Sequence, residues 1–124
     1  MTILTSNAPQ PIGPYSQAIS EGGFIFCSGQ IALDPKSGAM KNASIEEESK
    51  QVLANLSEVL NAGGGDLSSI IKTTIFLTDM NDFAKVNEIY AAALGESKPA
   101  RSTIAVSALP KGARIEIECI AKVL

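Results

Sequence analysis

The stretch Phe24–Leu33 reads Phe-Ile-Phe-Cys-Ser-Gly-Gln-Ile-Ala-Leu, and it decides what kind of sheet this chain forms. Side chains of a β-strand alternate between two faces. Here one face receives Phe24, Phe26 and Ser28, and the other receives Ile25, Cys27 and Gly29. Neither face is polar over most of the strand, so the sequence predicts a strand that is covered on both sides.

Two helices are expected further along the chain. The first begins at a capping box, Ser44-Ile-Glu-Glu47, has apolar residues at helical spacing, and ends at the glycine triplet Gly63–Gly65. Asp79 or Asn81 is expected to cap the second helix, which ends near Gly95. One face of this second helix carries Phe83, Val86, Tyr90 and Leu94, with the polar residue Asn87 among them.

The remaining strand-like runs flank these helices. They are Ser16–Ser20, Ile70–Leu77, the run that follows Arg101, and Arg114–Val123. The order of strands, helix, strand, helix and strands predicts one α+β domain over residues 1–124, with about six strands and both helices packed on one face of the sheet.

Two helices can cover only one face of such a sheet. The other face would keep Phe24 and Phe26, and it would also hold Ile70 and Phe76 from the strand after the first helix. A monomer would expose these side chains as a large apolar patch. We therefore expect an obligate oligomer, in which a partner subunit covers the patch.

The composition restricts the possible chemistry. A net charge of −3 and the absence of tryptophan argue against a nucleic-acid-binding surface. Histidine is also absent, which removes the usual general base, the Ser-His and Cys-His nucleophile pairs and most zinc sites. Cys27 and Cys119 fall in apolar strand-like runs and are interpreted as small buried residues rather than a redox pair. Without a secretory leader or a long apolar run, the sequence predicts a cytoplasmic protein that does not span a membrane.

The octapeptide Pro99–Val106, Pro-Ala-Arg-Ser-Thr-Ile-Ala-Val, contains the strongest candidate for a binding residue. Arg101 stands at the entrance of a strand, where its planar guanidinium offers a fork to a carboxylate or a phosphate. The alternative is a solvated cation beside a strand. Glu116 and Glu118 share one face of the last strand, which by default is an exposed face. Asn87 either bridges to a loop backbone or lines a site.

Four groups of motifs, in this order and over nearly the whole chain, resemble the RidA (YjgF) family. They are Ile12-Gly-Pro-Tyr-Ser-Gln-Ala18, Ser28-Gly-Gln30, Thr78-Asp-Met-Asn-Asp-Phe83 with Val86-Asn87, and Pro99-Ala-Arg-Ser102 followed by Leu109-Pro-Lys-Gly-Ala-Arg-Ile-Glu-Ile-Glu118. The resemblance implies a chorismate-mutase-like mixed sheet and a homotrimer whose sites lie in clefts between subunits. It also implies an enamine/imine deaminase that needs no cofactor. Such enzymes hydrolyse 2-aminoacrylate and related 2-imino acids, shed by pyridoxal-phosphate enzymes, to 2-keto acids and ammonia.

The same resemblance assigns roles to individual residues. Arg101 matches the arginine that binds the substrate's carboxylate, and Glu116 matches the glutamate that holds the attacking water. The residues that match the lining of the cleft are Tyr15, Ser28, Gly29 and Asn87. Thr103 completes the substrate-binding set at a position where the family often has cysteine, which implies that no thiolate nucleophile is needed.

Two other functions remain open from the sequence alone. A non-catalytic trimer that binds small carboxylates, as a sensor or chaperone, would use the same cleft. RNA cleavage that inhibits translation is also claimed within the family, but a pI near 4.9 and the missing histidine argue against it.

Overall fold

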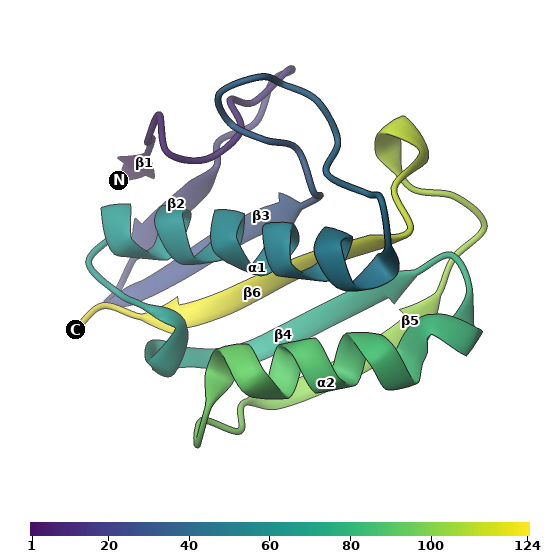
Figure 1. Ribbon diagram of the computed structural model, residues 1–124. Coiled ribbons are helices and arrows are strands. Elements are labelled where there is room, and N and C mark those ends of the chain that lie inside the picture. The colour runs from purple at the N-terminus through teal and green to yellow at the C-terminus, as the bar shows by residue number, and fades with distance from the viewer.

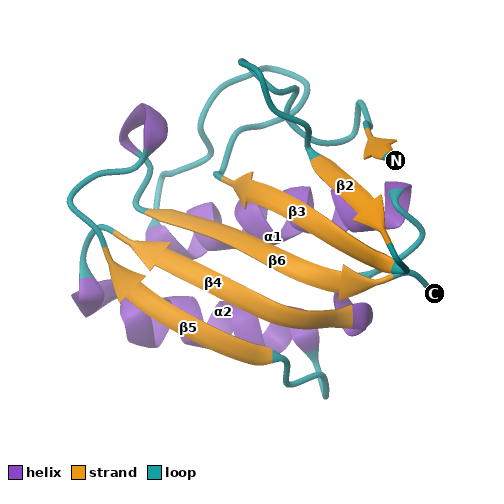
Figure 2. Ribbon diagram, turned by 180° about the vertical axis from the view of Figure 1, so that it is seen from behind, coloured by secondary structure: helices purple, strands orange, loops and turns teal.

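The computed structural model describes residues 1–124. Its six strands form one mixed sheet, and both helices pack against the same face of that sheet (Figure 1). The strands are β1 (Thr2–Ile3), β2 (Ala18–Glu21), β3 (Phe24–Gln30), β4 (Ile70–Leu77), β5 (Ala100–Ala105) and β6 (Ile115–Lys122). Their spatial order is β1-β2-β3-β6-β4-β5. Seen from behind, the sheet has no helix in front of it (Figure 2). The predicted α+β architecture is therefore confirmed.

The strand pairing explains how the two helices reach the same face. β2 and β3 form an antiparallel hairpin, β3 and β4 both pair antiparallel with β6, and β5 pairs parallel with β4. The helix α1 (Ile45–Ala62) connects β3 to β4, and α2 (Phe83–Leu94) is the crossover between the parallel strands β4 and β5. The two-residue strand β1 pairs with β2 and is too short to be recognised from alternation.

The two helix starts differ in how well the sequence predicted them. The Ser44 hydroxyl accepts a hydrogen bond from the Glu47 backbone N–H at 3.1 Å, as expected for the cap of α1. Asp79 accepts from the Asn81 backbone N–H at 2.9 Å, but this bond caps a short 3-10 turn, Met80–Asp82, that precedes α2. Because α2 itself has no side-chain cap, the prediction that Asp79 or Asn81 caps it is wrong. Neither helix has the length and apolar character that crossing a membrane requires.

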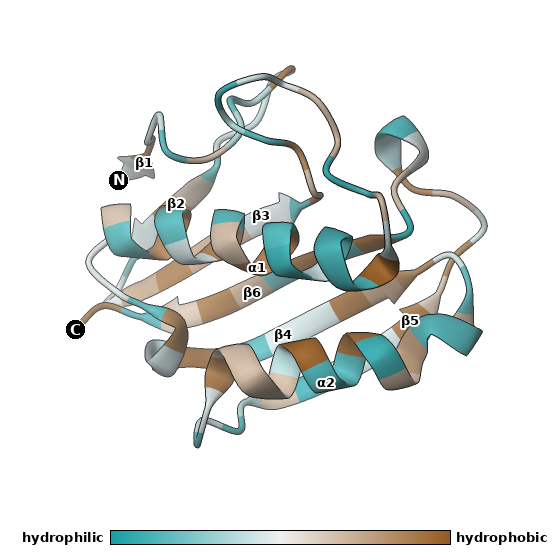
Figure 3. Ribbon diagram, in the orientation of Figure 1, coloured by the Kyte–Doolittle hydropathy of each residue, from teal (hydrophilic) through white to brown (hydrophobic).

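The core lies between the helices and the inner face of the sheet. Its fully buried side chains include Ile25, Ile75, Ile115 and Ile117 from the strands, and Val52, Leu56, Val59, Leu60 and Val86 from the helices. Both helices carry hydrophilic residues, whereas hydrophobic positions run along the central strands (Figure 3). Cys27 and Cys119 lie opposite each other on β3 and β6, buried and free, as interpreted from the sequence. A hydrogen bond to Cys119 and burial raise the pKa of the Cys27 thiol, which keeps it protonated.

The outer face of the sheet, which no helix covers, is rich in apolar side chains. Phe24, Phe26 and Ile104 are 41%, 45% and 45% exposed there. Phe76 is half-buried and pairs across the strands with Glu116. The uncovered apolar face that the sequence predicted is therefore present in the single chain.

Ile70 does not belong to this face, contrary to the prediction. The register of β4 against β6 shifts between Ile70 and Lys72, so Ile71 is an extra, unpaired residue. This bulge turns Ile70 into the core, where it is 7% exposed, and it turns Ile71 outward, where it is 39% exposed. The prediction assumed strict alternation, which fails at the bulge.

Candidate active site

Glu116 lies on the outer face of β6, beside the point where the pairing with β3 becomes irregular. The register between the two strands shifts after Cys27 and resumes at Gln30, which leaves a bulge around Gly29. A Cβ built on Gly29 would overlap the Glu116 carboxylate. The missing side chain at Gly29 therefore creates the space that the carboxylate occupies.

A pocket of about 370 Å³ opens next to the Glu116 carboxylate, and Tyr15 and Gly29 also line it. The other lining residues are Pro9, Gln10, Ile12, Gln17, Gln30, Ile31, Leu33, Pro110 and Lys111. Ser28 is not among them. Its hydroxyl donates to the Ser16 carbonyl oxygen at 2.6 Å, and so ties the segment that carries Tyr15 to β3. The structure thus brings together Tyr15, Gly29 and Glu116, with Ser28 supporting the wall behind them.

The environment of Glu116 disfavours its charged form. Partial burial is the larger cause and the neighbouring carboxylate of Glu118 the smaller one, and together they raise the pKa of Glu116. A carboxylate whose pKa is raised accepts a proton more readily than an ordinary carboxylate does. The electrostatics therefore suit Glu116 for proton transfer.

Gln17 belongs to this half of the site, and the sequence interpretation missed it. Its side chain is 1% exposed, accepts from the Thr5 backbone N–H at 2.7 Å, and donates to the carbonyl oxygens of Thr5 and Pro9 at 3.0 and 2.9 Å. The amide thereby fixes the N-terminal segment that forms one wall of the pocket. The only signal in the sequence was its position inside the Ile12–Ala18 motif.

Arg101 lies on the edge strand β5, with its side chain against α2. Its Nη1 donates a hydrogen bond to Asn87 Oδ1 at 2.7 Å. The guanidinium carbon lies 5.0 Å from the ring centroid of Tyr90 and 5.5 Å from that of Phe83. Arg101 and Asn87 line a pocket of about 370 Å³. Arg101 is therefore not a free surface cation, and Asn87 contacts a predicted site residue rather than a loop backbone.

Thr103 follows Arg101 by two residues on β5 and lies on the same face of the sheet. It is partly buried beside Ile75 of β4, and its Oγ1 has no hydrogen-bond partner in the protein. A buried hydroxyl without a partner carries an energetic cost that a bound polar group would relieve. Thr103 thus shares the inner face of β5 with Arg101, but it does not line the pocket of Arg101 and Asn87.

The two groups of predicted residues lie on opposite faces of the sheet. Glu116 alternates with the fully buried Ile115 and Ile117 and therefore faces outward, whereas Arg101 contacts α2 on the inner side. The strand β4 also separates β6 from β5. One protomer does not bring Arg101 and Glu116 into the same pocket, so a site that contains both requires two copies of the chain.

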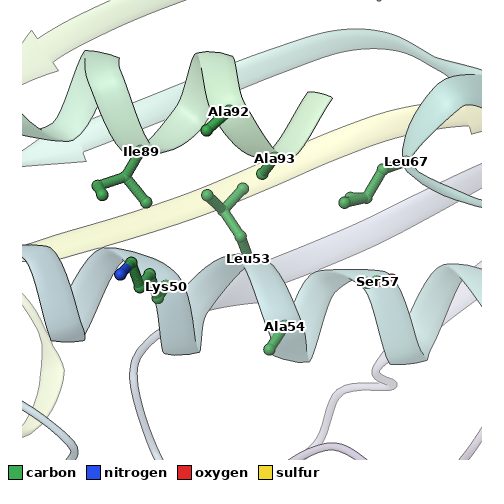
Figure 4. Close-up of a pocket in the computed structure, with 8 residues that line it drawn as sticks. All are labelled: Lys50, Leu53, Ala54, Ser57, Leu67, Ile89, Ala92 and Ala93. Carbon is green, nitrogen blue, oxygen red and sulfur yellow. The ribbon is translucent and has the colours of Figure 1, made fainter. Parts of the chain in front are cut away.

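A third depression, of about 430 Å³, lies between α1 and α2 (Figure 4). Its walls are mostly apolar, with Leu53, Leu67 and Ile89 among them, and Lys50 is its only charged residue. No residue predicted for the site lines it. We therefore do not regard this groove as the candidate active site.

The arrangement supplies one cation for an acid group and one carboxyl group for proton transfer. Arg101 uses one of its five N–H donors in the bond to Asn87, which leaves the others for a carboxylate. Glu116 provides a group that can hold a water molecule and exchange a proton with it. No group of three or more Cys, Asp or Glu side chains is placed to hold a metal ion.

Comparison with known proteins shows relatives along nearly the whole chain. The model of the family described as Endoribonuclease L-PSP matches residues 5–123. A RutC family protein of Pyrococcus horikoshii is 56% identical over 119 residues, which cover 96% of this chain and 94% of that protein. The human 2-iminobutanoate/2-iminopropanoate deaminase is 50% identical over 119 residues, which cover 96% of this chain and 87% of that protein. The solved structure of E. coli TdcF with bound serine has a TM-score of 0.94 at 39% identity and covers 98% of both chains.

The chain belongs to this family, which is the RidA (YjgF) family that its sequence motifs resemble. The description of the family names an endoribonuclease, whereas the name of the human relative is that of a deaminase. The residues of the site have to decide between these two kinds of chemistry.

Proposed function

We propose that the protein is a cytoplasmic deaminase that hydrolyses 2-aminoacrylate and small 2-imino acids to 2-keto acids and ammonia. The observation that carries this proposal is the Arg101 guanidinium, held by Asn87 and two aromatic rings with most of its donors free for a carboxylate. The deaminase name of the human relative supports it, as does the serine bound to TdcF, because serine presents a carboxylate beside an amine-bearing carbon.

The proposal includes a homotrimer with its sites between subunits. The apolar outer face of the sheet needs a cover, and three copies around an axis would bury it. Arg101 and Glu116 face away from each other in one protomer, so a neighbouring subunit has to bring the second half of each site. Both observations support the same arrangement.

The mechanism follows from the two groups. Two charge-assisted hydrogen bonds from Arg101 to the substrate's carboxylate would contribute about 1.5–3 kcal/mol each and hold the C=N carbon at a fixed place. Glu116 would orient a water molecule that adds to this carbon, and would pass its proton to the nitrogen. The resulting carbinolamine then expels ammonia and leaves the 2-keto acid. Because imines also hydrolyse unaided, positioning can supply the acceleration without a covalent intermediate.

The source of the substrate would be pyridoxal-phosphate enzymes that eliminate water from hydroxyl-bearing amino acids. Such eliminations release an enamine, which tautomerises to the 2-imino acid before hydrolysis. The test is therefore a coupled assay, in which a serine dehydratase generates 2-aminoacrylate and the release of pyruvate and ammonia is followed.

The wild-type protein should accelerate the release of pyruvate and ammonia, and Arg101→Ala should abolish the acceleration while the oligomer stays intact. The matched control is Lys85→Ala, which removes an exposed cation from α2 and should leave the rate unchanged. An unchanged rate in Arg101→Ala would remove Arg101 from the mechanism.

Two other outcomes would favour the rival functions. Tight binding of a 2-keto acid without any turnover would favour a non-catalytic carboxylate-binding trimer. Degradation of RNA by the purified protein, lost on substitution of one site residue, would favour the chemistry in the family's description. The net charge of −3 and the lack of histidine make us expect no cleavage of RNA.

A further inference from the structure

We propose that Tyr90, anchored by Thr73, is the positioning residue that sets the direction of the Arg101 guanidinium and thereby the affinity of the site for a carboxylate. The inference rests on the proposed function, because it concerns the group that the substrate's acid would occupy. Nothing in the motifs assigns a role to either residue, and the sequence alone predicts Tyr90 as part of the apolar face of α2.

Arg101 rests against a short stripe of α2. Phe83, Asn87 and Tyr90 follow one another at spacings of four and three residues, which places them on one side of the helix. The Tyr90 ring is the nearer of the two aromatic rings to the guanidinium, at 5.0 Å. Asn87 holds a single nitrogen of the fork, Nη1, at 2.7 Å. The rings therefore have to determine the plane in which the remaining donors lie.

The Tyr90 ring is itself held by a residue of the sheet. Its hydroxyl shares a hydrogen bond of 2.8 Å with Thr73 Oγ1, and the two residues are 7% and 1% exposed. A buried tyrosine hydroxyl with one strong partner holds its ring in one orientation. Thr73 lies on β4 at the register position directly beside Arg101 on β5. The strand that carries the anchor thus pairs directly with the strand that carries Arg101.

This arrangement has a consequence for binding. An exposed arginine side chain loses rotational freedom when it grips a ligand, and that loss weakens the complex. A guanidinium that is already held over the Tyr90 ring loses less rotational freedom on binding. This preorganisation of Arg101 acts when the substrate binds, so it should appear in substrate affinity rather than in the rate of the chemical step.

NMR can follow the Arg101 guanidinium directly. Arg101 and Arg114 are its only arginines, so a ¹⁵N spectrum contains two Nε–Hε signals. Arg114 is bound by Glu48 and serves as an internal control. In Tyr90→Leu the Arg101 signal should lose the part of its ring-current shift that comes from Tyr90, and its Nη groups should rotate faster, while the Arg114 signal stays in place.

The kinetic measurement uses four variants and the dehydratase-coupled assay. Tyr90→Leu removes the ring, and it should raise KM and the dissociation constant of pyruvate about 5- to 30-fold, with kcat within about twofold of wild type. Tyr90→Phe and Thr73→Val keep the ring but release it, and should show a smaller rise of about two- to fivefold. Thr73→Ser keeps the hydroxyl and should restore wild-type values.

The outcomes separate this inference from the proposed function. The inference would be overturned if Tyr90→Leu kept the KM, the pyruvate affinity, the turnover and the Arg101 signal of the wild type. The proposed deaminase function would then remain intact. A loss of melting temperature and kcat alone, at constant KM and pyruvate affinity, would make Tyr90 a structural residue and would also overturn it. Wild-type protein that binds pyruvate but turns over no imine would refute the deaminase, and the pyruvate and NMR measurements would still decide the role of Tyr90.

Discussion

Replacing Arg114 by methionine should destabilise the protein more than any exposed charge substitution, because it removes the cation that is paired with a buried carboxylate. Glu48 on α1 has a side chain that is 0% exposed, and its oxygens accept hydrogen bonds from the Arg114 backbone N–H at 2.7 Å and from Nε at 2.8 Å. Arg114 also donates from Nη2 to the Asn42 carbonyl oxygen at 2.9 Å. This ion pair joins the first turn of α1 to the start of β6, two residues before Glu116.

The expected loss of stability follows from the burial of Glu48 and from the bonds that the Arg114 side chain makes. A hydrogen bond to a charged group is worth about 1.5–3 kcal/mol, and breaking a buried pair by removing one partner costs about 3–5 kcal/mol. We expect Arg114→Met to lower the free energy of unfolding by about 3–5 kcal/mol, which for a domain of this size lowers Tm by roughly 10–20 °C. The double variant Glu48→Leu/Arg114→Met removes both charges and should be less destabilised than Arg114→Met alone.

The assay is urea denaturation at neutral pH, with the slope of the transition checked for each variant. The matched control is Lys41→Met, which breaks the exposed ion pair between Lys41 and Asp34, whose atoms are 3.5 Å apart. Because the pair lies at the surface, that substitution should leave the urea midpoint close to the wild-type value. A loss below about 1 kcal/mol in Arg114→Met, or a double variant as unstable as the sum of the two single variants, would refute the reasoning.

Three further predictions concern the site and the oligomer. Gly29→Ala should displace the Glu116 carboxylate and lower kcat at least tenfold at an unchanged pyruvate affinity; normal kcat would show that the overlap is relieved elsewhere. The raised pKa of Glu116 means that its contribution to stability is fully present below the ordinary glutamate value of 4.5 and is lost as pH rises through the raised value. Denaturation curves of Glu116→Gln should therefore show a smaller loss of stability over that pH range. Glu118→Gln should move the loss to lower pH, because it removes a neighbouring negative charge. Curves identical to wild type for both variants would contradict the raised pKa of Glu116. Phe26→Lys, which puts a charge on the apolar outer face, should give monomers in analytical ultracentrifugation, and an intact trimer would show that this face is not the interface.

The fold could be predicted from the sequence wherever local chemistry and alternation agree. The cap at Ser44 and the alternation of β6 are local signals, and the structure confirms both. Ile70 was misplaced because a bulge depends on how β4 pairs with β6, which a single strand's pattern does not contain. Asp79 was misassigned because the same capping chemistry serves a 3-10 turn as well as a helix.

The candidate site could be predicted only in part. Motifs identified Arg101 and Glu116 as residues, but not that they lie on opposite faces of the sheet, since that follows from the parallel pairing of β5 with β4. The apolar spacing of α2 made Tyr90 look like an ordinary core residue, although its ring supports a cation. Gln17 gave no sign of burial, because its partners are backbone groups of a segment without regular structure.

The central claim is that each active site combines Arg101 of one subunit with Glu116 of its neighbour. The most direct measurement is to assemble Arg101→Ala and Glu116→Gln chains together, after showing that each alone is an inactive trimer. In a closed ring of randomly mixed subunits at equal amounts, about a quarter of the interfaces join an intact Arg101 to an intact Glu116. We predict that about a quarter of wild-type deaminase activity returns on mixing. Mixed trimers that stay inactive would contradict the account.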